Sequence, residues 1–222
     1  VKTKIIVANK DTPAWCKVTA IVQRSRGDDP ITVWVGLPLN HWNGRFHGTG
    51  GGGFAGGIPG ENRILGMVQQ IPAGFAVAAT DAGPRTTLPG RNVKNGEFAL
   101  DENGRLDWLA IRNFSYRGIH QMTLTGKLIT SAFYGENPRY AYFSGCSTGG
   151  RQGLMEAQRY PDDYDGILAA APAINGASYA PARLWGQLLM KELKHYVSAC
   201  KFRAATEAAV IACDGIDGVI DG

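Results

Sequence analysis

The chain has 222 residues, of which 44% are hydrophobic and 19% charged, and its formal net charge is +4. This length and composition suit one sizeable core, or one domain and the start of another. The small positive excess is spread along the chain, and no apolar run approaches the ~20 residues of a membrane span. The sequence therefore predicts neither a nucleic-acid partner nor a membrane segment.

The predicted elements begin with strands and continue with strands and helices in alternation. Residues 16–24 and 31–38 alternate apolar and polar side chains and are rich in β-branched residues, which predicts two strands joined by a turn over 25–30. The later predicted segments are, in order, a short buried strand at 44–50, a buried strand at 74–81, a helix at 107–134, a strand at 139–144, a helix at 149–160 and a strand at 166–172.

Two domains follow from this order. Strands and helices alternate from about residue 45 to 172, which predicts an α/β fold with a mostly parallel sheet. After Pro172 the strand patterns stop and the sequence becomes helical in character. We therefore expect a first domain over residues 1–172 and the start of a second, helical domain over residues 173–222.

The sequence GCSTG at residues 145–149 has the G-x-S-x-G spacing of a serine nucleophile. Ser147 lies between a predicted strand and a predicted helix, as a nucleophile elbow requires. The tight turn needs small neighbours, which Gly145 and Gly149 provide, and the amide of Thr148 is placed to stabilise an oxyanion. A structural serine in a strand-to-helix turn is the alternative that this motif leaves open.

A glycine-rich loop at residues 48–57 follows an earlier predicted strand. Gly52 and Gly53 are our candidates for the second oxyanion amide. In α/β-hydrolases with a nucleophile elbow, that amide comes from a loop after an early strand. The loop also contains G-x-G-x-x-G, but no P-loop lysine, strong following helix or well-placed acidic residue accompanies it. Nucleotide binding is therefore the weaker alternative, and no organic cofactor is predicted.

The acid and base that such a serine needs are not evident in the sequence. In α/β-hydrolases an Asp or Glu and then a His follow the serine in the chain. The only histidine after Ser147 in this sequence is His195, which lies in a helix-like segment. Asp162, Asp163 and Asp165 precede a strand and would lie at the wrong edge of the sheet. We expect the acid and base beyond residue 222, in the same chain or in a second one. A non-catalytic binding fragment is the alternative from another functional class.

The four cysteines indicate one candidate disulfide within the chain. Cys16, Cys146, Cys200 and Cys213 include no C-x-x-C pair, so a zinc or thioredoxin-like motif is not indicated. Cys200 and Cys213 enclose a short alanine-rich segment, and we expect them to form a disulfide if the protein is exported.

The stretch CDGIDGVIDG at residues 213–222 places Asp214, Asp217 and Asp221 in a glycine-punctuated loop. Calcium takes several oxygen ligands, including carboxylates and backbone carbonyls, although this spacing is not that of an EF-hand. Taken alone, the loop also fits a solvated acidic turn.

Five segments together resemble the tannase and feruloyl esterase family of serine hydrolases. They are CKVTAIV, LPLNHWNGRFHGTGGGGFAGG, GFAVAATDAG, FSYRGIHQMTLTGKLITSAFYG and YFSGCSTGGRQGLMEAQRYPDDYDGILAAAPA. The resemblance covers nearly all of the chain. It implies the N-terminal part of an α/β-hydrolase core over residues 1–172 and the start of a helical lid domain over residues 173–222.

The resemblance also implies roles for particular residues. Ser147 would attack an ester carbonyl and form an acyl-enzyme, while the amides of Thr148 and of Gly52 or Gly53 would stabilise the oxyanion. Cys146 would be bonded to a cysteine beside the catalytic histidine, beyond residue 222. The rest of the enzyme is therefore the expected partner of these residues.

The resemblance further implies a structural calcium ion and a substrate class. The expected ligands are the carboxylates of Asp214, Asp217 and Asp221 and the carbonyl of Val219. The implied substrates are aromatic-acid esters: feruloyl or other hydroxycinnamoyl esters first, galloyl esters second and terephthalate half-esters third. We expect a secreted or periplasmic protein whose export signal has been removed.

Overall fold

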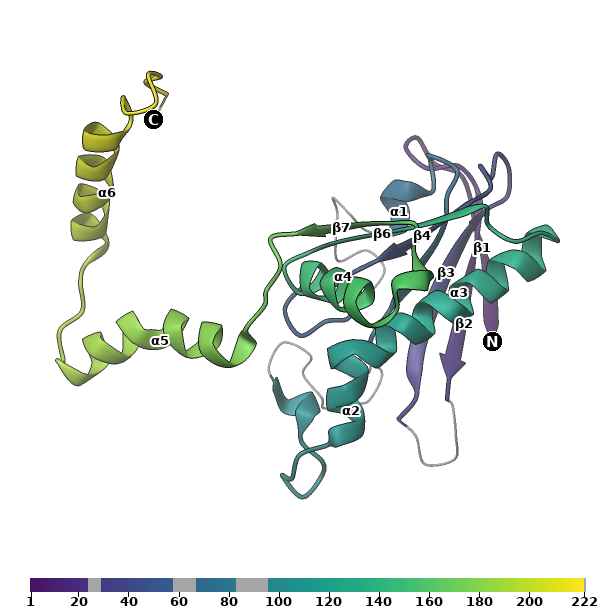
Figure 1. The fold of residues 1–222 in the computed structure, drawn as a ribbon, viewed down its shortest axis with the longest axis horizontal. Helices are drawn as coiled ribbons and strands as arrows, with labels where there is room; N and C mark the ends of the chain where they lie inside the picture. Colours follow the sequence, from purple (N-terminus) through teal and green to yellow (C-terminus); the bar gives the residue numbers. More distant parts are fainter. Residues whose placement is uncertain (24–28, 58–66, 83–95, 222) are drawn as a thin grey trace. The chain divides into compact units, whose positions relative to one another are not determined.

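The computed structural model describes residues 1–23, 29–57, 67–82 and 96–221 (Figure 1). The chain divides into two units, residues 1–173 and 174–222, which are considered separately below. Most of the turn predicted over residues 25–30 lies outside the described residues.

The first unit is built on a sheet with the strand order β1-β2-β3-β5-β4-β6-β7. The strands are β1 (Lys2–Ile6), β2 (Trp15–Val22), β3 (Ile31–Pro38), β4 (Arg45–Thr49), β5 (Ala76–Thr80), β6 (Tyr140–Cys146) and β7 (Gly166–Ala170). The predicted α/β fold is confirmed. The sheet is mixed, however, because β1, β2, β3 and β5 pair antiparallel while β5, β4, β6 and β7 pair parallel.

Strand β1 is absent from the sequence-based prediction. Its residues are exposed, except for the half-buried Ile6, so they carry no alternating pattern of core residues. The strand is held at the edge of the sheet by antiparallel pairing with β2, from Lys2 opposite Thr19 to Ile6 opposite Trp15. Pairing through backbone hydrogen bonds at an exposed edge does not require a particular pattern of side chains, so the sequence does not indicate it.

The helix predicted over residues 107–134 is confirmed as one helical run. It consists of α2 (Trp108–Arg112), the π-helical turn η2 (Asn113–Arg117) and α3 (Gly118–Tyr134). Asp107 caps its beginning, because its carboxylate accepts hydrogen bonds from the amides of Leu109 and Ala110. Gly135, at φ 78°, ends it in the left-handed conformation that glycine adopts without strain.

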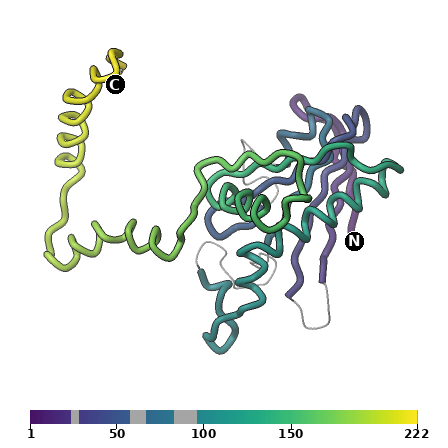
Figure 2. The backbone as a smooth tube through the Cα atoms, viewed as in Figure 1, coloured from purple at the N-terminus to yellow at the C-terminus, as the bar shows by residue number. Residues whose placement is uncertain are grey.

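Shorter helices complete the first unit. They are α1 (Met67–Gln70), η1 (Gly96–Ala99), α4 (Thr148–Arg159) and η3 (Pro161–Asp163). Helix α3 packs on β3 and β5, α4 packs on β6 and β7, and α1 packs on β5. The smooth trace in Figure 2 shows α3 and α4 running beside the sheet.

Two hydrophobic cores lie on the opposite faces of the sheet. All five residues of β5 are buried, and successive side chains point to opposite faces. Ala76 and Ala78 join the core that contains Phe46 and Ile119. Val77 joins the second core, which contains Met67 and Ile71. Each large side chain that is fully buried in this way contributes roughly 1.5–3 kcal/mol to stability.

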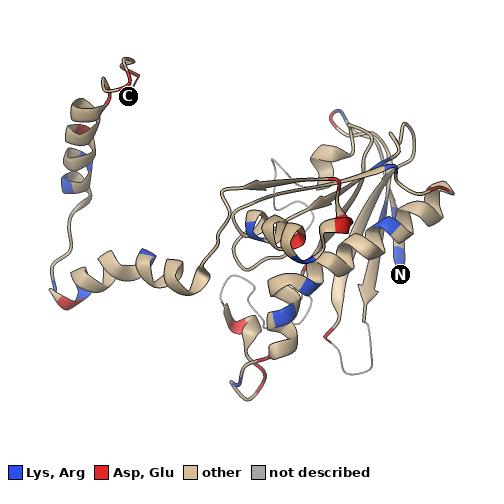
Figure 3. Cartoon of the chain, in the orientation of Figure 1, with Lys and Arg blue, Asp and Glu red and all other residues tan. Residues whose placement is uncertain are grey.

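The second unit contains α5 (Gly176–Glu192) and α6 (Ala199–Cys213), in agreement with the helical character predicted after Pro172. No residue of either helix is buried within this unit. Figure 3 shows positive and negative residues interspersed along the chain. Among the described residues, every helix is too short or too polar to cross a membrane.

Candidate active site

Ser147 lies at the sharp turn between β6 and α4. Its backbone has φ 62° and ψ −116°, which is a strained conformation for a residue with a side chain. The turn is held by main-chain hydrogen bonds, because Ser147 N donates to the Ala170 carbonyl (3.1 Å) and its carbonyl accepts from Arg151 N (3.0 Å). Ser147 is exposed, and its side chain makes no capping hydrogen bond to the helix. The strand, serine and helix therefore have the arrangement of a nucleophile elbow.

Glycines allow this turn to pack tightly. A Cβ on Gly145 would lie 2.5 Å from the carbonyl carbon of Gly149. A Cβ on Gly50, which belongs to the glycine-rich loop, would lie 2.5 Å from the Cα of the same Gly149. Side chains at these positions would push the loop away from the elbow, which explains why the motif needs glycine there.

The sheet brings the glycine-rich loop to the serine. Strands β4 and β6 are parallel neighbours, with Thr49 opposite Ser144, so the segments that follow both strands meet at one edge of the sheet. The hydroxyl of Thr148 donates to the carbonyl of Gly53 (2.6 Å), and Gly149 N donates to the carbonyl of Gly51 (2.8 Å). The loop is therefore bonded to the first turn of α4.

The candidate oxyanion glycines lie at the open part of this loop. Gly52 and Gly53 are exposed, and a Cβ on either would meet no atom within 4 Å. Gly53 has φ +57°. Gly53 is thus bonded to Thr148, the residue after Ser147, and open space lies in front of Gly52 and Gly53. The role of the Thr148, Gly52 and Gly53 amides in binding an oxyanion stays a prediction.

No histidine is bonded to Ser147 within the described residues. His47 is buried on β4, its Nε2 lies 3.2 Å from the hydroxyl of Ser144, and burial lowers its pKa to about 4. His120 contacts Asp163, and His195 is exposed in the second unit. The prediction that the acid and base lie beyond residue 222 stays a prediction.

Two of the aspartates before β7 have structural partners at the opposite end of the strands from Ser147. Asp165 accepts a hydrogen bond from Ala141 N (2.7 Å) near the start of β6. Asp163, in η3, lies 2.6 Å from Nδ1 of His120 on α3. Their placement agrees with the sequence-based argument that they lie at the wrong edge of the sheet.

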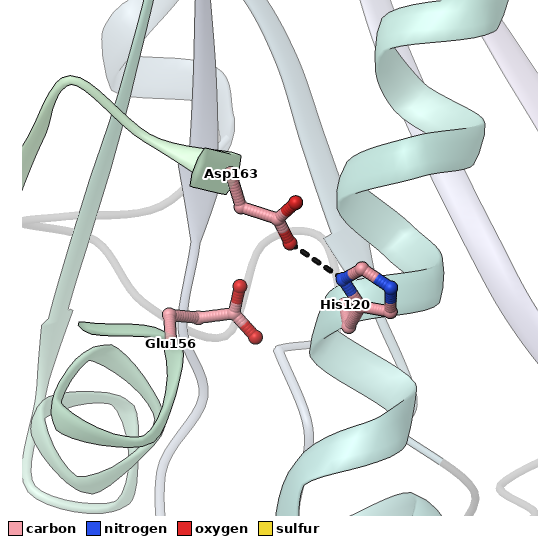
Figure 4. Close-up of side chains that lie close together, drawn as sticks. All are labelled: His120, Glu156 and Asp163. Carbon is pink, nitrogen blue, oxygen red and sulfur yellow. Dashed lines mark hydrogen bonds and ion pairs between the residues drawn. The ribbon is translucent and has the colours of Figure 1, made fainter. Parts of the chain in front are cut away.

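Asp163, His120 and Glu156 form a partly buried cluster that the sequence reasoning missed (Figure 4). One oxygen of each carboxyl group and a ring nitrogen of His120 all lie within 4.8 Å of one another. Glu156, on α4, is 0% exposed, and burial followed by the neighbouring Asp163 carboxyl raises its pKa to about 9. The ring of Tyr160 stacks on that of His120, with 3.8 Å between the ring centroids.

The charge around this cluster can be balanced by a proton. The Lys127 ammonium donates to the Asp163 main-chain carbonyl (2.5 Å), so one positive charge already lies beside the carboxyl groups. With Glu156 protonated, the Asp163 carboxylate and the Lys127 ammonium balance each other. His, Asp and Glu are also the residue types that bind divalent cations. His120 lies 43 positions before Asp163 and Lys127 lies 36 positions before it, so no local spacing could have indicated that α3 completes this cluster.

The predicted disulfide between Cys200 and Cys213 is wrong for this structure. Both cysteines are free and exposed. They lie near opposite ends of α6, and a helical separation of thirteen residues corresponds to about 20 Å. A disulfide requires Cα atoms within about 7 Å. Cys146 is also free here and half-buried, and its predicted partner lies outside the chain.

The acidic loop of the second unit places its three aspartates around one pocket. Asp214, Asp217 and Asp221 all line it. The carboxylates also organise the loop, because Asp217 accepts from Val219 N (3.0 Å) and Asp214 accepts from Asp221 N (3.2 Å). The three do not converge as closely as the residues of the His120 cluster. The oxygen donors are of the kind that calcium prefers.

Comparisons of the sequence and of the structure with known proteins both find feruloyl esterases and tannases. The sequence is 43% identical to a probable feruloyl esterase of Arthroderma benhamiae over 208 residues, which is 93% of this chain and 37% of the relative. It is 34% identical to feruloyl esterase B of Aspergillus niger, with 93% and 37% covered. Tannin acyl hydrolase from Aspergillus niger has a similar structure, with a TM-score of 0.80, 28% identity, and 99% of this chain and 41% of that chain covered.

The chain therefore spans little more than a third of the length of these curated relatives. A sequence profile described as tannase and feruloyl esterase matches residues 16–222. The match covers nearly the whole chain and includes the elbow, the glycine-rich loop and the acidic loop, so the chain belongs to the tannase and feruloyl esterase family.

Proposed function

We propose that the protein to which this chain belongs is a serine carboxylic-ester hydrolase of aromatic-acid esters, with hydroxycinnamoyl esters such as feruloyl esters as its preferred substrates. The observation that carries the proposal is the exposed Ser147, strained at φ 62° and bonded through its neighbours to an open glycine loop. The names of the relatives, feruloyl esterases from two fungi, support the substrate class.

In the proposed mechanism, Ser147 Oγ attacks the ester carbonyl, and a histidine beyond residue 222 accepts its proton. The amides of Thr148 and of Gly52 or Gly53 stabilise the negative charge that develops on the carbonyl oxygen. The alcohol leaves after it receives that proton, and water then attacks the acyl-enzyme and releases the aromatic acid. The dipole of α4, whose first residue is Thr148, also favours negative charge at this position.

Galloyl esters are the second candidate substrates, because one solved structure that is similar over 99% of this chain is a tannin acyl hydrolase. The test is to assay the full-length protein against methyl ferulate and methyl gallate, and to label it with a fluorophosphonate probe. We expect faster hydrolysis of the ferulate and covalent labelling of Ser147. A protein that hydrolyses neither ester and takes up no label would instead be a non-catalytic binding protein.

We further propose that calcium is a structural ion of the acidic loop. Asp214, Asp217, Asp221 and the carbonyl of Val219 would hold it, and the common pocket lined by the three carboxylates supports this assignment. A bound cation offsets the repulsion among carboxylates held in one short loop. The ion takes no part in the proposed ester hydrolysis.

Chelation of calcium is expected to destabilise the full-length protein. Binding well above its dissociation constant contributes about 2–3 kcal/mol, which corresponds to a fall of roughly 5 °C in melting temperature when EDTA is added. Added Ca²⁺ should restore the melting temperature. Asp217→Asn should lose this response, whereas Asp162→Asn, at an exposed position in the first unit, should keep it. A melting curve that EDTA leaves unchanged would contradict the calcium site.

Cys146 is proposed to form a disulfide with a cysteine outside this chain, as the resemblance implies. Its half-buried thiol at the end of β6, one residue before Ser147, would then tie a distant segment to the elbow. Such a bond implies an oxidising compartment, and hence a secreted or periplasmic protein.

A further inference from the structure

The side chain of Gln152 links α4 to both ends of the open segment of the glycine-rich loop. Gln152 is 2% exposed. Its Oε1 accepts a hydrogen bond from Gly51 N (3.0 Å), and its Nε2 donates to the carbonyl of Gly56 (3.2 Å). Gly51 and Gly56 lie on either side of Gly52 and Gly53, so one amide group closes the loop on both sides of the candidate oxyanion residues.

The chemistry of these two contacts requires a carboxamide. The Gly51 amide can only donate and the Gly56 carbonyl can only accept, so the side chain must offer an acceptor and a donor side by side. This requirement also fixes which end of the Gln152 amide is oxygen. Both partners are buried, and a buried backbone group left without a hydrogen bond costs about 1–3 kcal/mol.

The same face of α4 makes another contact with the loop. Thr148 lies one helical turn before Gln152, and its hydroxyl donates to the carbonyl of Gly53. At the far end of the loop, a Cβ on Gly56 would collide with the main chain of Asp81 at the end of β5. The loop is thus held between α4 and the sheet, and its exposed part is the segment that contains Gly52, Gly53 and Phe54.

We propose that Gln152 is a positioning residue for the oxyanion-binding loop, because its carboxamide fixes Gly51 and Gly56 and so holds the amides of Gly52 and Gly53 beside Ser147. This inference rests on the proposed esterase function. The contribution is to the transition state, since the negative charge that these amides stabilise develops only after Ser147 has attacked. Gln152 itself does not touch the substrate.

The test uses Gln152→Met in the full-length protein, which keeps the length of the side chain but removes both hydrogen bonds. We expect kcat to fall by about 10²-fold, the usual effect of misplacing catalytic groups by about 1 Å, while KM changes little. Gln158→Met is the matched control, because Gln158 is exposed on the same helix, and it should leave both constants unchanged.

Gln152→Glu gives a second readout that loss of packing alone would not produce. Protonated glutamic acid can accept from Gly51 N and donate to the Gly56 carbonyl, whereas the carboxylate can only accept. The kcat of this variant, relative to that of the unmodified protein, should therefore rise as the pH is lowered. No such recovery is expected for Gln152→Met.

The outcomes separate this inference from the proposed function. If the unmodified protein hydrolyses no ester, the esterase proposal fails before Gln152 is tested. If it is active and Gln152→Met keeps its kcat, the positioning role is overturned and the esterase proposal stands. A lower melting temperature with unchanged kcat at a temperature where the variant is folded would mean that Gln152 only stabilises the fold, which also overturns the inference.

Discussion

Replacing Ser147 with alanine in the full-length protein is expected to reduce kcat for ester hydrolysis by about 10⁴–10⁶-fold. The hydroxyl oxygen is the only non-hydrogen atom that the change removes, and it is the atom that would form the acyl-enzyme. The residual activity would come from substrate binding and the oxyanion amides alone. Steady-state kinetics with methyl ferulate, together with loss of fluorophosphonate labelling, measure the effect.

Two further variants make this result specific. Ser131→Ala removes a hydroxyl from the end of α3, close to Asn137 and the start of β6, and should leave kcat unchanged. Ser147→Gly should be as inactive as Ser147→Ala but more stable, by about 1–3 kcal/mol, because glycine adopts φ 62° without strain. Appreciable hydrolysis by either Ser147 variant would mean that another residue is the nucleophile.

The fold was largely predictable because the buried strands have strong local patterns. Strand β5 is a compact apolar run, and the G-x-S-x-G sequence lies where β6 must end and α4 must begin. Strand β1 was not predictable, since exposed side chains say little about the pairing of its backbone. The error over Cys200 and Cys213 has a physical cause as well, because the helical segment that was expected between them is one continuous helix and holds the two cysteines about 20 Å apart.

The residues of the candidate site also fall into two groups, those that the sequence indicates and those that only the structure reveals. Ser147, Thr148 and the loop glycines could be chosen as candidates from the sequence, because a nucleophile elbow requires particular residues at fixed spacing. The role of Gln152 depends on contacts with residues about 100 positions away, and that of Glu156 on contacts with α3 and η3. Buried polar contacts between distant segments become visible only when the packing of the helices is known.

Glu156 leads to the second large expected effect, which is a pH dependence of stability. The pKa of its carboxyl group is raised from 4.5 to about 9 in the folded protein, first by burial and then by Asp163. The groups near it are Asp163 in η3, Lys127 and His120 on α3, Tyr160 after α4, and the buried Tyr164. Folding therefore favours the protonated form of Glu156.

The direction of the effect follows from proton linkage. Between about pH 4.5 and pH 9 the folded state keeps the Glu156 proton while the unfolded state has lost it. The free energy of unfolding therefore falls as pH rises through this range, by at most about 1.4 kcal/mol per pH unit. Below pH 4.5 the contribution of the protonated group is fully present, and above the folded pKa it is lost.

Glu156→Gln removes this titration while keeping the shape of the neutral side chain. The variant should be close in stability to the unmodified full-length protein near pH 5 and more stable by several kcal/mol near pH 9, as measured by urea unfolding at both pH values. Glu136→Gln, at an exposed position after α3, should show the same small difference at both. Repeating the measurements with EDTA distinguishes a proton from a metal ion. If the unmodified protein were instead more stable than Glu156→Gln near pH 9, and EDTA removed that advantage, a bound cation and not a proton would occupy the space between α3 and α4.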